Sequence, residues 1–238
     1  MFQSRRRRVF AGVMMGAALS VASVGCSSTR SAQVEESWLA RVPEDQLGGV
    51  REAQSERRIA QDAVTRSDVA LNDARRELEV AKRNEDAAKA RLEAHEAALK
   101  AARATGQSDN INQAQSERKN AETSLNAAQA QVRYREQAIQ TMEAQKELRE
   151  AELAVADAKL DMAEYQALEA NQDVRAQELS EADFSAATAD AQRKVEESQR
   201  KLQSEQRSEQ QARANWQRMR SQVQGYGGSG IESEQRNP

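Results

Sequence analysis

The chain has 238 residues and a formal net charge of −3, and 31% of its residues are charged while only 3% are aromatic. So few bulky side chains cannot enclose the deep core of a globular enzyme, and this composition is typical of a long helix or coiled coil. We also see no basic patch of the kind that nucleic-acid binding requires, and almost no aromatic side chains to stack on bases, so nucleic acid is not an expected partner.

Residues 1–25 are typical of a cleaved export signal. Arg5–Arg8 form a basic start, and Val9–Val24 form an apolar run that is too short and too rich in small residues for a comfortable membrane span. Removal of this segment takes away four arginines and no acidic residue, so the net charge of −3 becomes −7.

The signal ends in Ser-Val-Gly-Cys at residues 23–26, which resembles the lipobox of bacterial lipoproteins. The resemblance implies cleavage between Gly25 and Cys26 and a covalent diacylglycerol on the Cys26 thiol. Cys26 is the only cysteine, so no internal disulfide can form, and lipidation would explain a lone cysteine in an exported protein. The alternative is an unlipidated signal that contains a cysteine. Ser27 follows in place of Asp, which by the same resemblance implies the outer membrane of a Gram-negative bacterium, with the protein facing the periplasm.

The mature chain divides into a tether, a helical domain and a tail. Residues 26–42 are predicted to hold the lipidated cysteine and a flexible tether. Within the tether, Trp38-Leu39 is a small apolar spot that we expect to dock on the base of the coil; the alternative is contact with the membrane surface. Residues 43–224 are predicted to be the helical coiled-coil domain, and the Gly-rich residues 225–238 a disordered tail.

The first helix is predicted over about residues 43–104, because Pro43 and the acidic residues after it suit a helix start. From Val50 to Ala102, one large apolar residue and one Ala-type residue recur in each heptad, which is the pattern of a helix that packs against another helix. The large residues of this seam are Val50, Val64, Leu71, Leu78, Leu92 and Leu99, interrupted by Arg57 and Glu85.

The second helix is predicted over about residues 110–170. Gly106 can take the left-handed conformation that ends a helix, and so short a connection makes the two helices antiparallel neighbours. The matching seam on the second helix contains Ile111, Leu125, Val132, Ile139, Leu153 and Leu160. A second stripe contains Tyr134, Thr141, Leu148, Val155 and Met162. It lies about 140° around the helix from the first, so this helix requires two neighbours, either as the middle helix of a three-helix bundle or as the shared helix of an oligomer.

The third helix is predicted over about residues 181–224, with a weaker seam that includes Phe184, Val195, Leu202, Trp216 and Met219. The sequence therefore predicts an all-α fold: a long antiparallel helical hairpin in a three-helix coiled-coil bundle, with flexible termini. One alternative stays open, because residues 170–180 contain no Gly or Pro and the heptad register continues through them. A single straight helix of about 115 residues would then span about 170 Å.

The sequence offers little catalytic chemistry. His95 is the only histidine and occupies an Ala-type seam position, so we interpret it as a tolerated seam residue and not as a metal ligand. A nucleophile and base pair cannot be assembled without a second His or Cys, and no Gly-rich phosphate loop is present. We expect no enzyme activity, no metal and no cofactor apart from the covalent lipid on Cys26.

Three functions remain, in order of preference. The first is a lipid-anchored structural or scaffolding lipoprotein that binds envelope proteins, or further copies of itself, through its charged helix faces. The second is an accessory component of an envelope export or efflux assembly, because long periplasmic hairpins with polar tips resemble those of adaptor proteins in shape. The third is a binder of peptidoglycan or of a small molecule, which would need a pocket or aromatic side chains that stack on sugars; Trp38, Trp216 and a few tyrosines are available for that.

Overall fold

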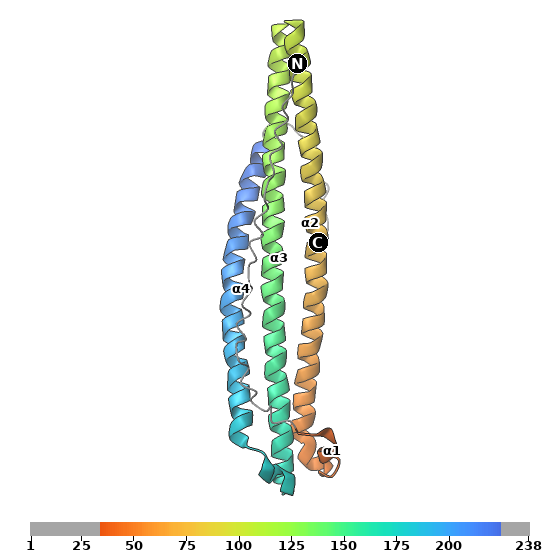
Figure 1. Ribbon diagram of the computed structural model, residues 1–238, viewed down its shortest axis with the longest axis vertical. Helices are drawn as coiled ribbons and strands as arrows, with labels where there is room; N and C mark the ends of the chain where they lie inside the picture. Colours follow the sequence, from red (N-terminus) through yellow and green to blue (C-terminus); the bar gives the residue numbers. More distant parts are fainter. Residues whose placement is uncertain (1–33, 225–238) are drawn as a thin grey trace, which may run out of the picture. The chain divides into compact units, whose positions relative to one another are not determined.

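The computed structural model describes residues 34–224, and in this range the prediction of an all-α fold is confirmed (Figure 1). The elements in chain order are α1 (Glu36–Leu39), the 3-10 helix η1 (Glu44–Leu47), α2 (Gly48–Thr105), α3 (Ser108–Ala170), the 3-10 helix η2 (Val174–Glu178) and α4 (Glu181–Gln224). The chain turns between the second and third long helices, as the predicted three-helix fold requires, and the alternative of a single straight helix is excluded. The signal residues 1–25, Cys26 and the tail 225–238 lie outside the described residues.

A two-residue connection joins α2 to α3. Gly106 ends α2 in the left-handed conformation with φ of 73°, and its N–H donates to the Arg103 carbonyl at 3.3 Å. Glycine suits this position because it has no Cβ to clash in the left-handed region. The hairpin that results places α2 and α3 side by side and antiparallel along their length (Figure 1).

The α2–α3 interface is the seam read from the heptads. On α2, every seam position except Arg57 is buried or half-buried. Among the large apolar residues of the two helices, Leu71, Leu99, Val132 and Ile139 are buried, while Val64, Leu78, Leu92, Leu125, Leu153 and Leu160 are half-buried. Ion pairs bridge the seam at its edges, including Lys146 Nζ to Asp68 Oδ1 at 2.7 Å, which raises the pKa of Lys146.

The third long helix, α4, packs on the second stripe of α3. Leu148 and Thr141 of that stripe are buried, and Phe184 and Ala191 of α4 are buried against it. Within the described residues no Cα atom of α2 comes within 8 Å of one in α4. The three helices therefore form an open layer with α3 in the middle, as Figure 1 shows. The spacing of the stripes explains this, because stripes about 140° apart hold the outer helices too far apart to touch, whereas a closed bundle needs about 60°.

The helix α4 is shorter than the hairpin and ends before its turn (Figure 1). Ala127, near the level where α4 ends, is 2% exposed, and beyond it the stripe on α3 becomes polar, with Gln113, Ser116, Asn120 and Thr123. We call the α2–α3 region beyond the end of α4 the hairpin tip. In the hairpin tip these four stripe residues are exposed or half-buried, whereas an apolar stripe would require another helix to cover it.

The opposite end of the layer holds the one compact apolar cluster that the described residues form. Its buried members are Val34, Leu39, Val42, Val50, Tyr165, Ala167, Leu168, Ala176 and Phe184. Tyr165 stacks on Phe184 with ring centroids 5.1 Å apart, and Leu168 is 0% exposed. We call this end the base; it joins the start of α2, the end of α3 and the start of α4.

Two boundaries differ from the sequence analysis. The tether was expected to reach residue 42, but residues 34–42 include α1 and pack into the base because Val34, Leu39 and Val42 are apolar enough to be buried. The α-helix predicted from residue 43 begins at Gly48, after the 3-10 turn of η1. Trp38 packs against the base cluster, which is the docking we expected of it.

Candidate functional site: the groove face

One row of α3 lies between the seam that faces α2 and the stripe that faces α4. Its residues recur at heptad spacing and are Glu117, Ser124, Gln131, Ala138, Gln145, Glu152 and Lys159. Three hollows open along this row, and each is lined by at least one of its members. We call this surface the groove face.

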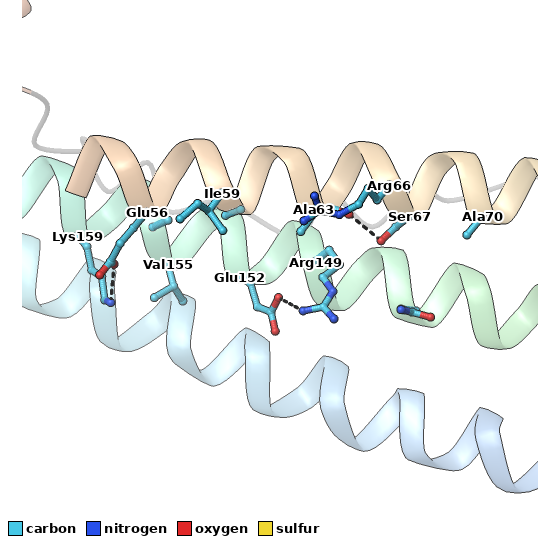
Figure 2. Close-up of a pocket in the computed structure, with 13 residues that line it drawn as sticks. Glu56, Ile59, Ala63, Arg66, Ser67, Ala70, Arg149, Glu152, Val155 and Lys159 are labelled. Atoms are coloured by element: carbon cyan, nitrogen blue, oxygen red, sulfur yellow. Dashed lines mark hydrogen bonds and ion pairs between the residues drawn. The ribbon is translucent and has the colours of Figure 1, made fainter. Parts of the chain in front are cut away.

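The largest hollow, of about 650 Å³, lies between α2 and α3 (Figure 2). Its apolar lining comes from Ile59, Ala63 and Val155 among others, and Ile59 is 64% exposed. Charged side chains close its edge, where Lys159 Nζ donates to Glu56 Oε2 at 2.9 Å. It is an open groove with an apolar floor and a charged rim, which is how interaction surfaces differ from ordinary helix faces.

A second hollow, of about 340 Å³, lies on the other side of the same row, between α3 and α4. It shares Glu152 and Val155 with the first, so the two hollows adjoin on α3. The wall that α4 contributes contains Val195 but is otherwise polar, with Gln192 and Gln199. The groove face can therefore offer amide hydrogen bonds on one side and an apolar floor on the other.

A third hollow, of about 230 Å³, opens at the hairpin tip around His95. His95 Nδ1 lies 3.6 Å from Glu117 Oε2, and Arg91 lines the same hollow. The structure thus places the single histidine at the half-buried edge of the seam, with one carboxylate beside it. Within residues 34–224 no group of three His, Cys, Asp or Glu side chains could hold a metal ion.

A band of stacked aromatic and cationic groups joins the three helices. Tyr134 of α3 stacks on Trp216 of α4 with ring centroids 5.4 Å apart and planes at 5°. The Arg135 Cζ lies 5.2 Å from the Tyr134 centroid, and its Nη1 donates to Glu77 Oε2 of α2 at 2.5 Å. Sequence reasoning placed Tyr134 and Trp216 on facing stripes without pairing them; the antiparallel register of α3 and α4 supplies the missing information.

At the base, Arg175 links the turn between α3 and α4 to α1. Its Nε donates to Asp173 Oδ1 at 2.7 Å, and its Cζ lies 5.2 Å from the Trp38 centroid. This hydrogen bonding from the Arg175 side chain, supported by its backbone N–H, lowers the pKa of Asp173 to about 2. No local pattern predicts this contact, because α1 and the turn are far apart in the chain.

The described residues place these groups on open surfaces, not around an enclosed pocket. No family model, curated protein or solved structure matches the chain. No helix in the described range is long and apolar enough to cross a membrane.

Proposed function

We propose that the protein is a lipid-anchored scaffold, or protein-interaction module, on the periplasmic face of the outer membrane. The observation that supports this most is the open layer: within the described residues, α2 and α4 each pack on α3 and not on one another, so three long helices display extended charged faces and a groove. A chain that needed a closed catalytic pocket would instead gather its helices around it.

The position of the base fits an N-terminal anchor. Val34 is buried in the base cluster, and Cys26 precedes it by eight residues, which reach at most about 28 Å when extended. A lipid on Cys26 would hold the base near the membrane. The hairpin tip would then stand away from it, at the end of a 58-residue helix that is about 87 Å long.

Replacement of the lipidated residue tests the anchor. We expect Cys26→Ala to abolish acyl labelling and to remove the protein from the outer-membrane fraction, since one lipid supplies the anchorage. Ser27→Asp is the matched variant: it keeps the lipid, and we expect it to move the labelled protein to the inner membrane. Outer-membrane fractionation of Cys26→Ala without any acyl label would refute the lipoprotein assignment.

Interaction along the groove face tests the scaffold role. A photoreactive residue in place of Ile59, which is 64% exposed, should give defined crosslinks to envelope proteins in cells. The same substitution at Val174, which is 73% exposed but lies in the turn at the base, is the control. Equal or absent crosslinking from both positions would argue against the groove face as the interaction surface.

The hairpin tip favours the second candidate, an accessory role in an export or efflux assembly. The tip consists of α2 and α3 alone and presents polar residues such as Gln113 and Asn120. Deletion of residues 92–98 together with 116–122 removes one heptad from each arm and keeps the seam in register. An accessory role predicts loss of one abundant complex in pull-downs from this variant, whereas a scaffold role predicts unchanged crosslinks from Ile59.

A further inference from the structure

The C-terminal part of α4, residues 207–224, has a charge balance unlike the rest of the helix. It carries Arg207, Arg213, Arg218 and Arg220 against the single acid Glu209. None of the four arginines has a carboxylate partner among the described residues. Earlier on α4, Arg193 pairs with Asp190 and Lys201 Nζ donates to Glu147 Oε1 at 2.7 Å. Lys194 and Arg200 also have no carboxylate partner among the described residues, but more acidic residues lie around them in the sequence. Polar residues separate these arginines in the sequence. At 100° per residue, Arg207 and Arg218 share one side of α4, and Arg213 and Arg220 share another side about 140° away.

Three of the four arginine side chains are exposed, and the fourth lies on an aromatic ring. Arg207, Arg213 and Arg218 are exposed. Arg220 is half-buried, with its Cζ 5.8 Å from the Trp216 centroid, and Trp216 is held by its stack on Tyr134. Gln210 and Gln217, also exposed, lie among them. We call these four arginines and two glutamines the arginine patch.

The composition of the arginine patch indicates the chemistry of its partner. Protein interfaces have an apolar or aromatic centre, and the large hydrophobic residues that are exposed in the described range, Ile59, Val69, Val80 and Val174, all lie outside α4. Guanidinium groups match carboxylates with paired hydrogen bonds, and glutamine amides match hydroxyl groups. A hydrated polymer that carries both groups fits this surface better than a folded protein does.

We infer that the arginine patch binds an acidic glycan, meaning a polysaccharide with carboxylate groups. This inference deepens the proposed scaffold function and rests on it for the choice between glycan and lipid. Arg220 follows the base residue Phe184 by 36 residues of helix, or about 54 Å. Charge interactions are screened beyond about 8 Å at physiological salt, so the headgroups of a membrane at the base are out of reach.

Binding of the full chain to polygalacturonate, a carboxylate-bearing glycan, tests the inference. The patch variant Arg213→Gln/Arg218→Gln/Arg220→Gln should bind at least about tenfold more weakly, given about 1 kcal/mol for each arginine near an anionic surface. The matched control Arg193→Gln/Lys194→Gln/Arg200→Gln removes the same charge from α4 nearer the base and should change the Kd less than about twofold. Circular dichroism should show equal helix content in both.

Further outcomes separate the partners. Wild-type binding should weaken as salt is raised, the patch variant should lose most of that salt dependence, and neutral dextran should not bind. Unchanged affinity of the patch variant, equal loss in the control, or equal binding of dextran would each overturn the inference. Preference for phosphatidylglycerol vesicles over polygalacturonate would overturn it in favour of lipid. Acyl labelling and fractionation of Cys26→Ala are independent of all these results, so either proposal can fail alone.

Discussion

Single carboxylates set the pH response of the helices. Asp161 of α3 is half-buried, and this burial raises the pKa of its carboxyl. The nearby Asp157 carboxylate raises the pKa further, and Arg57 lowers it in part. An acid whose pKa is raised by folding contributes stability below its unfolded pKa and loses it as pH rises through the folded value. At neutral pH the ionised Asp161 therefore destabilises the fold.

We predict that Asp161→Asn raises the free energy of unfolding at pH 7, and that the difference from wild type disappears at about pH 3. Urea unfolding followed by circular dichroism at the two pH values measures this difference in the free energy of unfolding. Asp157→Asn is the control: it removes the carboxylate that accepts from Arg57 Nε at 2.6 Å, so it should not stabilise. A lower stability of Asp161→Asn at pH 7 would show that its carboxylate is paired favourably.

The contact between Asp173 and Arg175 at the base has the opposite effect on how stability depends on pH. Asp173, with its pKa lowered to about 2 by Arg175, contributes stability that is complete above its unfolded value near 3.8 and is lost as pH falls towards 2. We predict that Arg175→Gln returns the Asp173 pKa towards 3.8, as read from the side-chain carboxyl shift in an NMR titration. A pKa that stays at about 2 in this variant would assign the shift to the backbone N–H of residue 175 and not to the guanidinium.

Some backbone conformations can be predicted from the residue at that position, and others cannot. The turn at Gly106 can be predicted, because glycine favours the left-handed region. Gln172 adopts φ of 55° without being glycine, and no local signal predicts that conformation. It is held by its surroundings, since the Asp173 N–H donates to the Leu168 carbonyl at 3.0 Å at the buried end of α3.

At the scale of elements, α2 and α3 depend on one seam. Leu71 is 6% exposed, so Leu71→Lys would bury a charge without a partner, and we predict a loss of about 3 kcal/mol or more in the free energy of unfolding. Val69→Lys is the matched control on the same helix, where the side chain is 56% exposed, and it should change stability by less than about 0.5 kcal/mol. Equal unfolding midpoints of the two variants in urea would mean that burial of the seam does not stabilise the hairpin.

The long helices could be predicted because their heptads repeat over many turns, so isolated polar residues such as Arg57 and Glu85 do not hide the pattern. The short elements, such as α1, could not be predicted in this way. The four residues of α1 have no periodicity, and they become helical because Leu39 is buried against parts of the chain more than a hundred residues away. Burial through tertiary contact leaves no mark in so short a segment.

For the helical part as a whole, the arrangement follows from the angle between the two stripes of α3. The sequence supplied that angle and the need for two neighbours. The consequence, that α2 and α4 do not touch and leave the groove face open, required the packed helices. The groove was therefore missed by sequence reasoning, although its row of residues can be read from the same heptads.

Among the described residues, α4 covers most of the length of the second stripe. A chain that ends at Ser180 would expose Leu148, now 8% exposed, together with Tyr165 and the rest of that stripe along α3. Because exposed apolar stripes pair with one another, we predict that residues 27–180 form dimers or larger species in light scattering at concentrations where residues 27–224 are monomeric. A monomeric 27–180 fragment would mean that α3 does not need α4. In that case the α3 stripe, and not only the groove face, would be available to envelope partners.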